Sequence, residues 1–428
     1  MKKQLIFMHQ NYPAQFGPIT RFLLQEYDVN IAFFSQYTAK NPVPGIRHYT
    51  YKPVSTGHEQ KPYFFSRYFE MECTAMHGVH NAVVTSGLQP DLFIGHVAFG
   101  NMGLLHVEYP EVPKIGFFEL FYDPYGRYSE SRPEYPAPKP NRLRVPLRNA
   151  TQLIELEYCT KGYSPTGFQR STYPEAYQSK LSVFFDGIDT HQYKPGDVAA
   201  NSQLPRTWPA DARLVTYVAR GLEAMRGFDI FMEVAHRVSQ KRPDVHFVIA
   251  GNPKTHYGSE MLQIKEETFK DYVMKLHPYD LNRFHFLNWI PEPALVDLFR
   301  LSDCHFYWTV PFTLSWSLFQ AMSTGCLVLG SNSAPVREAI TDGVNGVLLE
   351  PYNIDALEAG MLDMLDYPER YQPLREAARQ DMVEKYGFEV CLPNLAEFYL
   401  ATGSPAAPAI DSTPTHGLSV PANIPYSL

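Results

Sequence analysis

Two arginines in the second half of the chain have the spacing needed to hold a diphosphate. Arg220 and Arg226 follow an apolar stretch at 214–218 and precede a segment with helical periodicity. At the carboxyl end of a parallel strand, the chain enters the crevice where α/β proteins bind ligands. Two guanidinium groups on one loop there can form several charge-assisted bonds with a diphosphate. The alternative is a solvated loop with two surface arginines, so the interpretation needs a second strand end.

A helix start near residue 315 supplies that second strand end. It follows the apolar stretch 305–308, and Gly325 suits the left-handed termination of the helix. Free backbone N–H groups and the positive end of the helix dipole would then face the same crevice as the arginines. The alternative is an ordinary serine N-cap without a ligand. We expect the diphosphate to contact Ser315, Trp316 and Ser317.

Short apolar stretches predict the two sheets that position these residues. In the first half they are 4–8, 29–34, 92–95, 115–118, 162–164 and 181–184, and in the second half 214–218, 245–250, 284–287, 305–308 and 327–329. Several are apolar on consecutive residues, as in parallel strands covered on both faces. Helical patterns at 228–240, 293–301 and 354–365 separate the later stretches, which predicts alternating strands and helices.

The length of 428 residues exceeds what a single hydrophobic core usually organises, so we expect two domains. A polar segment with several prolines at 189–209 is the predicted linker, and we place the boundary near residue 195. Two aromatic-rich and proline-rich segments, 50–68 and 121–148, are either acceptor-binding loops or structural excursions. The proline-rich segment 402–428 is predicted to be a disordered tail.

The bulk composition excludes several classes of protein. A formal net charge of -8 argues against a nucleic-acid-binding protein, because phosphate neutralisation requires clustered basic residues. Five scattered cysteines fit neither a disulfide framework nor a zinc site and indicate a reducing compartment. The apolar run at 5–8 is too short for a signal peptide, and no stretch reaches the roughly 18 residues of a membrane span. We expect a cytoplasmic protein, with peripheral association at the inner face of the membrane left open.

Absent motifs narrow the function further. No two glycines are spaced G-x-G, which removes the dinucleotide fingerprint, and the common NTPase, zinc-protease and esterase motifs are also missing. We therefore expect no bound cofactor. The chain has no D-x-D pair, which in many sugar transferases holds a divalent metal on the donor diphosphate. Arginines and helix termini can neutralise a diphosphate instead, so we expect no metal.

The order of these motifs resembles the family-4 glycosyltransferases. In that family a strand leads into G-R-x-x-x-x-K-G, and E-G-F-G-L-x-x-x-E-A-M-A-x-G-x-P-V-V and a D-G-x-N-G turn follow later. The match runs from about residue 3 to 400 and is most specific between 214 and 349. The resemblance implies a metal-independent, retaining enzyme of the α/β GT-B fold, with two Rossmann-like parallel-sheet domains facing a cleft. The resemblance also implies that Arg220 and Arg226 bind the donor diphosphate, with Arg226 in place of the lysine of the motif.

The resemblance also implies a domain arrangement and further site residues. Residues 1–195 would form the acceptor-side domain, 196–375 the donor-binding domain, and 376–401 a helical crossover that packs back on the first domain. The implied contacts are Gly17 for the donor phosphates, His96 near the reacting carbon, Ile290 and Gln320 for the nucleoside, and Glu119 and Tyr122 on the acceptor side. As a lone residue, His96 would more often be a packed core or surface imidazole, but its place at the end of a strand favours a functional role. The implied partners are a nucleotide sugar and a carbohydrate or lipid-linked acceptor.

The sugar pocket departs from the family pattern. Phe312 replaces the first glutamate of the E-x7-E motif and Gln320 replaces the second. Gln320 can still bond ribose hydroxyls, whereas Phe312 cannot accept a hydrogen bond, so we expect Thr313 and Leu314 to contact the sugar through their backbone. The donor sugar stays open. A nucleotide-sugar 2-epimerase and a nucleotide-sugar-binding subunit without activity are the alternatives to a transferase.

Overall fold

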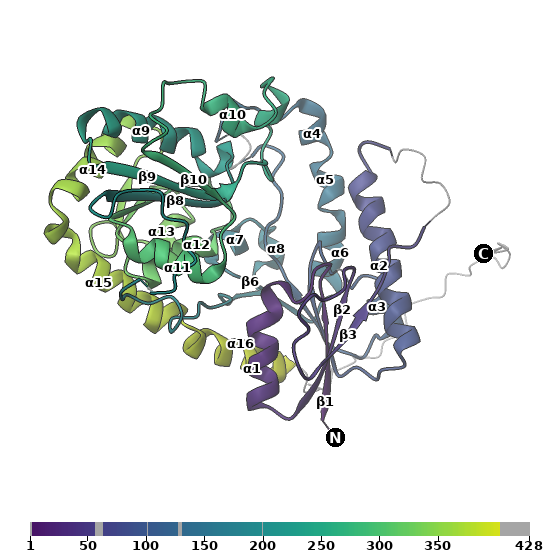
Figure 1. Cartoon of the computed structure of the whole chain (residues 1–428). Coiled ribbons are helices and arrows are strands. Elements are labelled where there is room, and N and C mark those ends of the chain that lie inside the picture. Colours follow the sequence, from purple (N-terminus) through teal and green to yellow (C-terminus); the bar gives the residue numbers. More distant parts are fainter. Residues whose placement is uncertain (1, 56–62, 101, 127–130, 199, 403–428) are drawn as a thin grey trace, which may run out of the picture.

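The structure is a computed structural model that describes residues 2–55, 63–100, 102–126, 131–198 and 200–402. It contains two entirely parallel sheets, each covered by helices, which form two separate domains (Figure 1). The strand orders are β3-β2-β1-β4-β5-β6-β7 and β10-β9-β8-β11-β12-β13. The expected α/β class with two Rossmann-like domains is confirmed.

The first sheet is built from the apolar stretches of the first half. Its strands are β1 (Lys3–Met8), β2 (Val29–Ser35), β3 (Ile46–Thr50), β4 (Leu92–His96), β5 (Lys114–Phe117), β6 (Lys161–Ser164) and β7 (Leu181–Val183). Its helices are α1 (Gly17–Glu26), α2 (Arg67–Ser86), α3 (Leu105–Glu108), α4 (Lys139–Leu143), α5 (Val145–Arg148), α6 (Ala150–Tyr158), α7 (Gly167–Ser171) and α8 (Glu175–Gln178). The central strand β1 is buried from Gln4 to Met8, as expected for a strand covered on both faces.

The second sheet has the same design. Its strands are β8 (Arg213–Gly221), β9 (Val245–Asn252), β10 (Phe284–Asn288), β11 (Cys304–Tyr307), β12 (Val328–Ser331) and β13 (Val347–Leu349). Its helices are α9 (Phe228–Lys241), α10 (Phe269–Val273), α11 (Glu292–Leu301), α12 (Trp316–Ser323), α13 (Val336–Ala339), α14 (Ile354–Asp366) and α15 (Gln372–Asp381). A continuous core under this sheet joins α9 and α14 to β8, β9 and β11.

Two strands were not predicted from the sequence. β3 pairs with β2 at one edge of the first sheet, and β13 pairs with β12 at one edge of the second. Edge strands contact a neighbour on one side only and need no long apolar run. β3 is accordingly half-exposed and polar, and β13 has only three residues after the turn at Gly343.

The C-terminal helix α16 (Phe388–Thr402) crosses from the second domain to the first and packs beside α1 (Figure 1). Leu392, Leu395 and Tyr399 join the core of the first sheet, and the hydroxyls of Tyr399 and Tyr163 lie 2.6 Å apart. The predicted crossover is therefore confirmed. The predicted tail, apart from Thr402, lies outside the described residues.

The connection between the sheets runs from the end of β7 at Val183 to the start of β8 at Arg213. The exact boundary at residue 195 stays a prediction. All five cysteines are free, and four of them are buried. None of the helices in the described ranges is long and apolar enough to cross a membrane.

Candidate active site

A cavity of about 610 Å³ lies between the two sheets. Its walls come from the carboxyl ends of strands in both domains, as the sequence predicted for the arginines. The predicted site residues that line it are His96, Glu119, Arg220, Arg226, Thr313, Leu314, Ser315 and Trp316. Residues separated by more than 200 positions in the sequence thus meet in one cleft.

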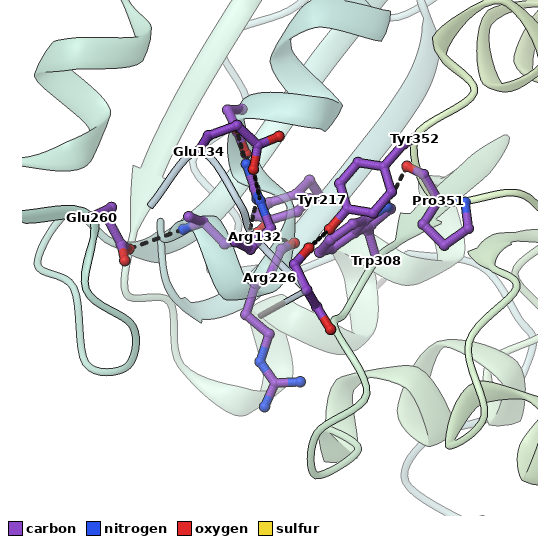
Figure 2. Close-up of polar contacts among 11 residues, drawn as sticks. Arg132, Glu134, Tyr217, Arg226, Glu260, Trp308, Pro351 and Tyr352 are labelled. Atoms are coloured by element: carbon purple, nitrogen blue, oxygen red, sulfur yellow. Dashed lines mark hydrogen bonds and ion pairs between the residues drawn. The ribbon is translucent and has the colours of Figure 1, made fainter. Parts of the chain in front are cut away.

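Arg226 is fixed in position at the floor of the donor side. It ends a short 3₁₀ helix (Ala224–Arg226) that follows β8. Its Nη1 donates hydrogen bonds to the Thr309 Oγ1 at 2.9 Å and to the Thr313 carbonyl at 2.8 Å. The Tyr217 hydroxyl donates a hydrogen bond of 2.9 Å to the Arg226 carbonyl. In Figure 2 the Arg226 side chain points away from Tyr217 and Arg132. A cation held by protein oxygens on one edge keeps its other donors for an anion.

Arg220 lies at the end of β8 and is exposed. Among the described residues, its side chain forms only a long hydrogen bond of 3.4 Å to the Tyr257 hydroxyl. A loosely held arginine can follow a ligand that changes charge or position, whereas a fixed one sets the ligand's place. The two predicted arginines therefore line the same cavity but differ in rigidity.

The helix at residue 315 begins as predicted. Ser315 is the N-cap of α12, and its Oγ accepts a hydrogen bond of 3.3 Å from the Ser317 N–H. The Ser315 N–H donates to the Tyr307 hydroxyl at 2.9 Å. The amide of Trp316, the first helical residue, takes part in neither bond and lies at the positive end of the helix dipole. Gly325 adopts the expected left-handed conformation, with φ of 81°.

His96 ends β4 and is buried against aromatic rings. Its Nδ1 lies 2.7 Å from the Val97 carbonyl, so this nitrogen carries the proton, and its Nε2 lies 3.6 Å from Glu119 Oε2. The rings of Phe99 and Phe117 lie 4.8 and 4.9 Å from the imidazole, measured between centroids. The imidazole is thus held in one orientation on the cleft wall opposite the arginines.

A second imidazole, His9, follows β1 and was missed by the sequence reasoning. Its ring centroid lies 5.1 Å from that of His96. Burial and the neighbouring His96 lower the pKa of His9 to about 3, so His9 is neutral at physiological pH. Its position directly after a buried strand was the available signal, but its partner comes from another strand.

Asp186 was also missed, although it lies in the short segment that follows β7. Its Oδ2 accepts a hydrogen bond of 3.3 Å from Trp316 Nε1 across the cleft. Burial and the nearby charge of Glu119 raise the pKa of Asp186 to about 7. The cleft therefore contains a carboxyl group that holds its proton near neutral pH, which suits proton transfer or binding of hydroxyl groups.

We predict that Asp186→Asn stabilises the protein more at pH 8 than at pH 4. The raised pKa means that the folded state resists ionisation, a penalty that grows as the pH rises from the unfolded value of about 3.9 towards 7. Because Asp186 lies at the cleft and is half-buried, so that part of its surface is exposed, we expect a gain in Tm of only about 2–4 °C. Thermal unfolding across pH measures it, with the exposed Asp197→Asn as control. An equal gain at both pH values would contradict the raised pKa.

The remaining predicted residues lie outside the cavity wall. Gly17 begins α1 beneath the loop that supplies Asn11, Ala14 and Gln15 to the wall, and Tyr122 lines a neighbouring cavity. Phe312 is buried in the core of the second domain, below Arg226, with 5.5 Å between guanidinium and ring. None of the three other predicted donor-side residues lines the cavity: Ser317 and Gln320 lie in α12, and Ile290 follows β10.

Comparison with known families agrees with this geometry. Residues 28–193 match the family described as "Glycosyl transferase family 4 group", and residues 203–381 match "Glycosyl transferases group 1". The chain belongs to the family-4 glycosyltransferases. In this family-4 chain, the first match covers most of the first sheet and the second match covers the second sheet.

Curated relatives of this family-4 chain are distant. Spore coat protein SA of Bacillus subtilis (strain 168) is 24% identical over 241 residues, which cover 54% of this chain and 60% of the relative. The D-inositol 3-phosphate glycosyltransferase of Kribbella flavida is 23% identical over 237 residues, or 54% of each protein. The glycogen synthase of Mycobacterium tuberculosis is 24% identical over 228 residues, or 52% of this chain and 49% of the relative. The chain thus spans about half the length of the curated relatives it matches.

Solved structures share the fold over nearly the whole family-4 chain. Sucrose-phosphate synthase from Thermosynechococcus elongatus superposes with a TM-score of 0.68 at 13% identity, covering 94% of this chain and 99% of that one. HepE from Anabaena in complex with UDP gives a TM-score of 0.64 at 13% identity, covering 94% and 100%. These likenesses establish the GT-B arrangement of the two domains.

Among the described residues, no group of three or more His, Cys, Asp or Glu side chains is placed to hold a metal ion. The metal-independent chemistry expected from the sequence stays a prediction. Positive charge at the cleft is instead supplied by Arg220 and Arg226.

Proposed function

We propose that the protein is a retaining glycosyltransferase that moves a sugar from a nucleotide-diphosphate sugar to a hydroxyl acceptor. One observation carries this proposal. Arg226, fixed by Thr309 and Thr313, faces a single cavity whose opposite wall carries His96. A donor could then place its diphosphate against Arg226 and the reacting carbon of its sugar near His96.

The donor diphosphate would bind to Arg226, to the exposed guanidinium of Arg220 and to the amide at the start of α12. These groups combine charge-assisted bonds with a helix N-terminus, which together suit a diphosphate without a metal. Gln320, in α12, would hold the ribose, and Ile290, which follows β10, would contact the base. The name of the HepE structure, which contains UDP, makes uridine the first base to try.

Catalysis would depend on charge stabilisation at the leaving group. As the bond between sugar and diphosphate breaks, negative charge grows on the phosphate oxygens that face Arg226. The acceptor hydroxyl would attack from the same face of the sugar as the departing diphosphate, which preserves the anomeric configuration. His96 would orient the sugar, and the protonated Asp186 would lie on the acceptor side with Glu119.

Phe312 leaves the sugar pocket without the usual carboxylate. Its ring packs 5.3 Å from the ring of Tyr257 and below Arg226, so it shapes the floor of the donor site. Backbone groups of Thr313 and Leu314, which do line the cavity, would bond the sugar hydroxyls. A 2-epimerase and an inactive binding subunit keep the same cleft and remain the competing functions. The relatives' names mention acceptors as different as inositol phosphate and glycogen and do not select one here.

A thermal-shift screen against a panel of nucleotide sugars tests the donor site. Because a ligand that binds only the folded state stabilises it by mass action, the correct donor at a hundredfold excess over Kd should add about 2.7 kcal/mol. The parent nucleosides, which lack the diphosphate, serve as matched ligand controls and should shift Tm far less. If no nucleotide sugar shifts Tm more than its nucleoside does, the proposed diphosphate site is wrong.

A further inference from the structure

Three arginines gather on the first domain, outside the cavity described above. Arg67 lies at the start of α2, Arg144 lies between α4 and α5, and Arg148 ends α5. We call these three residues the arginine cluster. α5 packs against α2, which brings the three guanidinium groups around one ring, that of Tyr68.

The arginine cluster has no acidic partner among the residues that the structure describes. No carboxylate in the described part of the chain lies within ion-pair distance of Arg67, Arg144 or Arg148, whereas Arg132 and Arg237 pair with acidic side chains. The Nη1 of Arg144 is buried and has no hydrogen-bond partner within the described ranges. A buried donor on a charged group costs free energy when it is left unsatisfied. An anion is the ligand that would satisfy it.

Aromatic rings hold the guanidinium groups in place. Arg144 stacks on Tyr68 at 4.7 Å and on Phe64 at 5.0 Å, measured from the guanidinium carbon to the ring centroid. Arg148 lies 3.6 Å from the centroid of the Tyr122 ring. Its Nη2 also donates a hydrogen bond of 2.6 Å to the Tyr122 hydroxyl. Arginines ordered by stacking lose little entropy when they bind a ligand, so they are preorganised.

The local potential at the arginine cluster is strongly positive. Burial opposes ionisation of Tyr68, yet the hydrogen bond from Arg67 and the charges of Arg144 and Arg148 hold its pKa below the usual value. Burial, together with the like charges of Arg67 and Arg148, lowers the pKa of Arg144. Within the described residues, these like charges are therefore held together without an ion-paired carboxylate, which is costly unless a ligand neutralises them.

A cavity of about 180 Å³ opens beside these side chains, and Arg144 and Arg148 line it. Its far wall contains Met225 and Gly258, the chain neighbours of Arg226 and Tyr257 in the main cavity. The carboxyl group of Glu260 also lines it, but burial raises the pKa of that group and the Ala224 N–H donates to it. The other acid on the wall, Asp123, accepts from the Tyr125 N–H.

We propose that the arginine cluster is a subsite for a phosphate group carried by the acceptor. The subsite adjoins the cleft on the side of Tyr122, three positions after Glu119, so a phosphorylated acceptor could place a hydroxyl in the cleft. That an acceptor carries this phosphate rests on the proposed function, whereas the binding of phosphate to the arginine cluster does not. Several guanidinium groups around one oxyanion give the charge-assisted, multidentate contacts that phosphate prefers.

Calorimetric titration with inorganic phosphate tests the subsite. The wild-type protein should bind phosphate at two sites, the arginine cluster and the donor arginines. Arg144→Gln/Arg148→Gln should weaken one site at least about tenfold, and Arg220→Gln/Arg226→Gln should weaken the other. Arg237→Gln/Arg242→Gln removes the same charge from arginines that are already paired and should keep both sites. Circular dichroism and a retained donor site show that the cluster variant is folded.

Two results would overturn the proposal: a wild-type isotherm with no site beyond the donor arginines, or unchanged binding in the cluster variant. Failure of the proposed function alone would instead leave phosphate binding unchanged in the Arg220→Gln/Arg226→Gln variant. Flotation with vesicles then identifies the source of the phosphate. If vesicles of phosphatidylcholine with phosphatidic acid retain wild type but not the cluster variant, the phosphate is a lipid headgroup. If neither is retained although phosphate binds, the acceptor is a soluble phosphate ester.

Discussion

Replacing Arg226 by alanine is expected to lower the turnover of a nucleotide sugar about 100-fold or more, with the fold intact. Arg226 is held by Thr309 and Thr313 so that its remaining donors face the diphosphate. Loss of one preorganised donor to developing negative charge typically costs 10²–10³ in kcat, or about 2.7–4 kcal/mol. Release of the nucleoside diphosphate, followed without any acceptor, measures the effect.

Two matched variants make the Arg226 result specific. Arg226→Lys restores the lysine of the family motif and should recover part of the rate, because it keeps the charge but not the bonding geometry. Arg220→Ala should cost less, since that side chain is exposed and held by one long bond. Turnover by Arg226→Ala within about threefold of wild type would exclude a role at the leaving group.

Replacing Arg132 by methionine is expected to destabilise the protein by about 3–5 kcal/mol, because it breaks a buried ion pair on one side only. Arg132 comes from the first domain and is 3% exposed. Its guanidinium forms a two-point ion pair with Asp229, in the first turn of α9. It also donates to the Ala224 carbonyl and lies 5.5 Å over the ring of Trp308.

The ion pair with Asp229 keeps Arg132 protonated despite its burial. Desolvation alone would lower the pKa of Arg132, but Asp229 and Glu134 raise it above the usual value. Urea unfolding of Arg132→Met measures the loss, and Arg132→Met/Asp229→Asn is the matched control. Removing both charges should recover much of the stability, since the more buried carboxylate, Asp229, is then no longer left unpaired, whereas Glu134 is exposed to solvent. A loss below about 1 kcal/mol in the single variant would show that the pair contributes little.

The elements that the sequence predicted well are those with a strong local signal. Buried parallel strands such as β1 and β9 are continuous apolar runs, and the N-cap at Ser315 and the left-handed Gly325 follow from residue type and position. The edge strands β3 and β13 have no such run, because an edge strand needs fewer apolar contacts.

The part of the site that escaped prediction depends on contacts between distant segments. His9 and Asp186 acquire shifted pKa values only where β1, β4, β7 and α12 meet. Arg132 and Asp229 are 97 positions apart, and the arginine cluster forms only when α2 packs against α5. Phe312, which takes the place of the first motif glutamate at the sugar pocket, is buried in the core below Arg226, and a contact between its ring and the sugar stays a prediction.

The most direct test of retaining transfer is proton NMR of the protein with its α-linked nucleotide sugar and no acceptor, recorded before the free sugar mutarotates. Water then takes the place of the acceptor hydroxyl. We predict that the α-anomer of the sugar appears first, together with the nucleoside diphosphate, and that Arg226→Ala suppresses both. Initial release of the β-anomer, conversion of the donor to its 2-epimer, or an unchanged donor that nevertheless binds would contradict retaining transfer at this cleft.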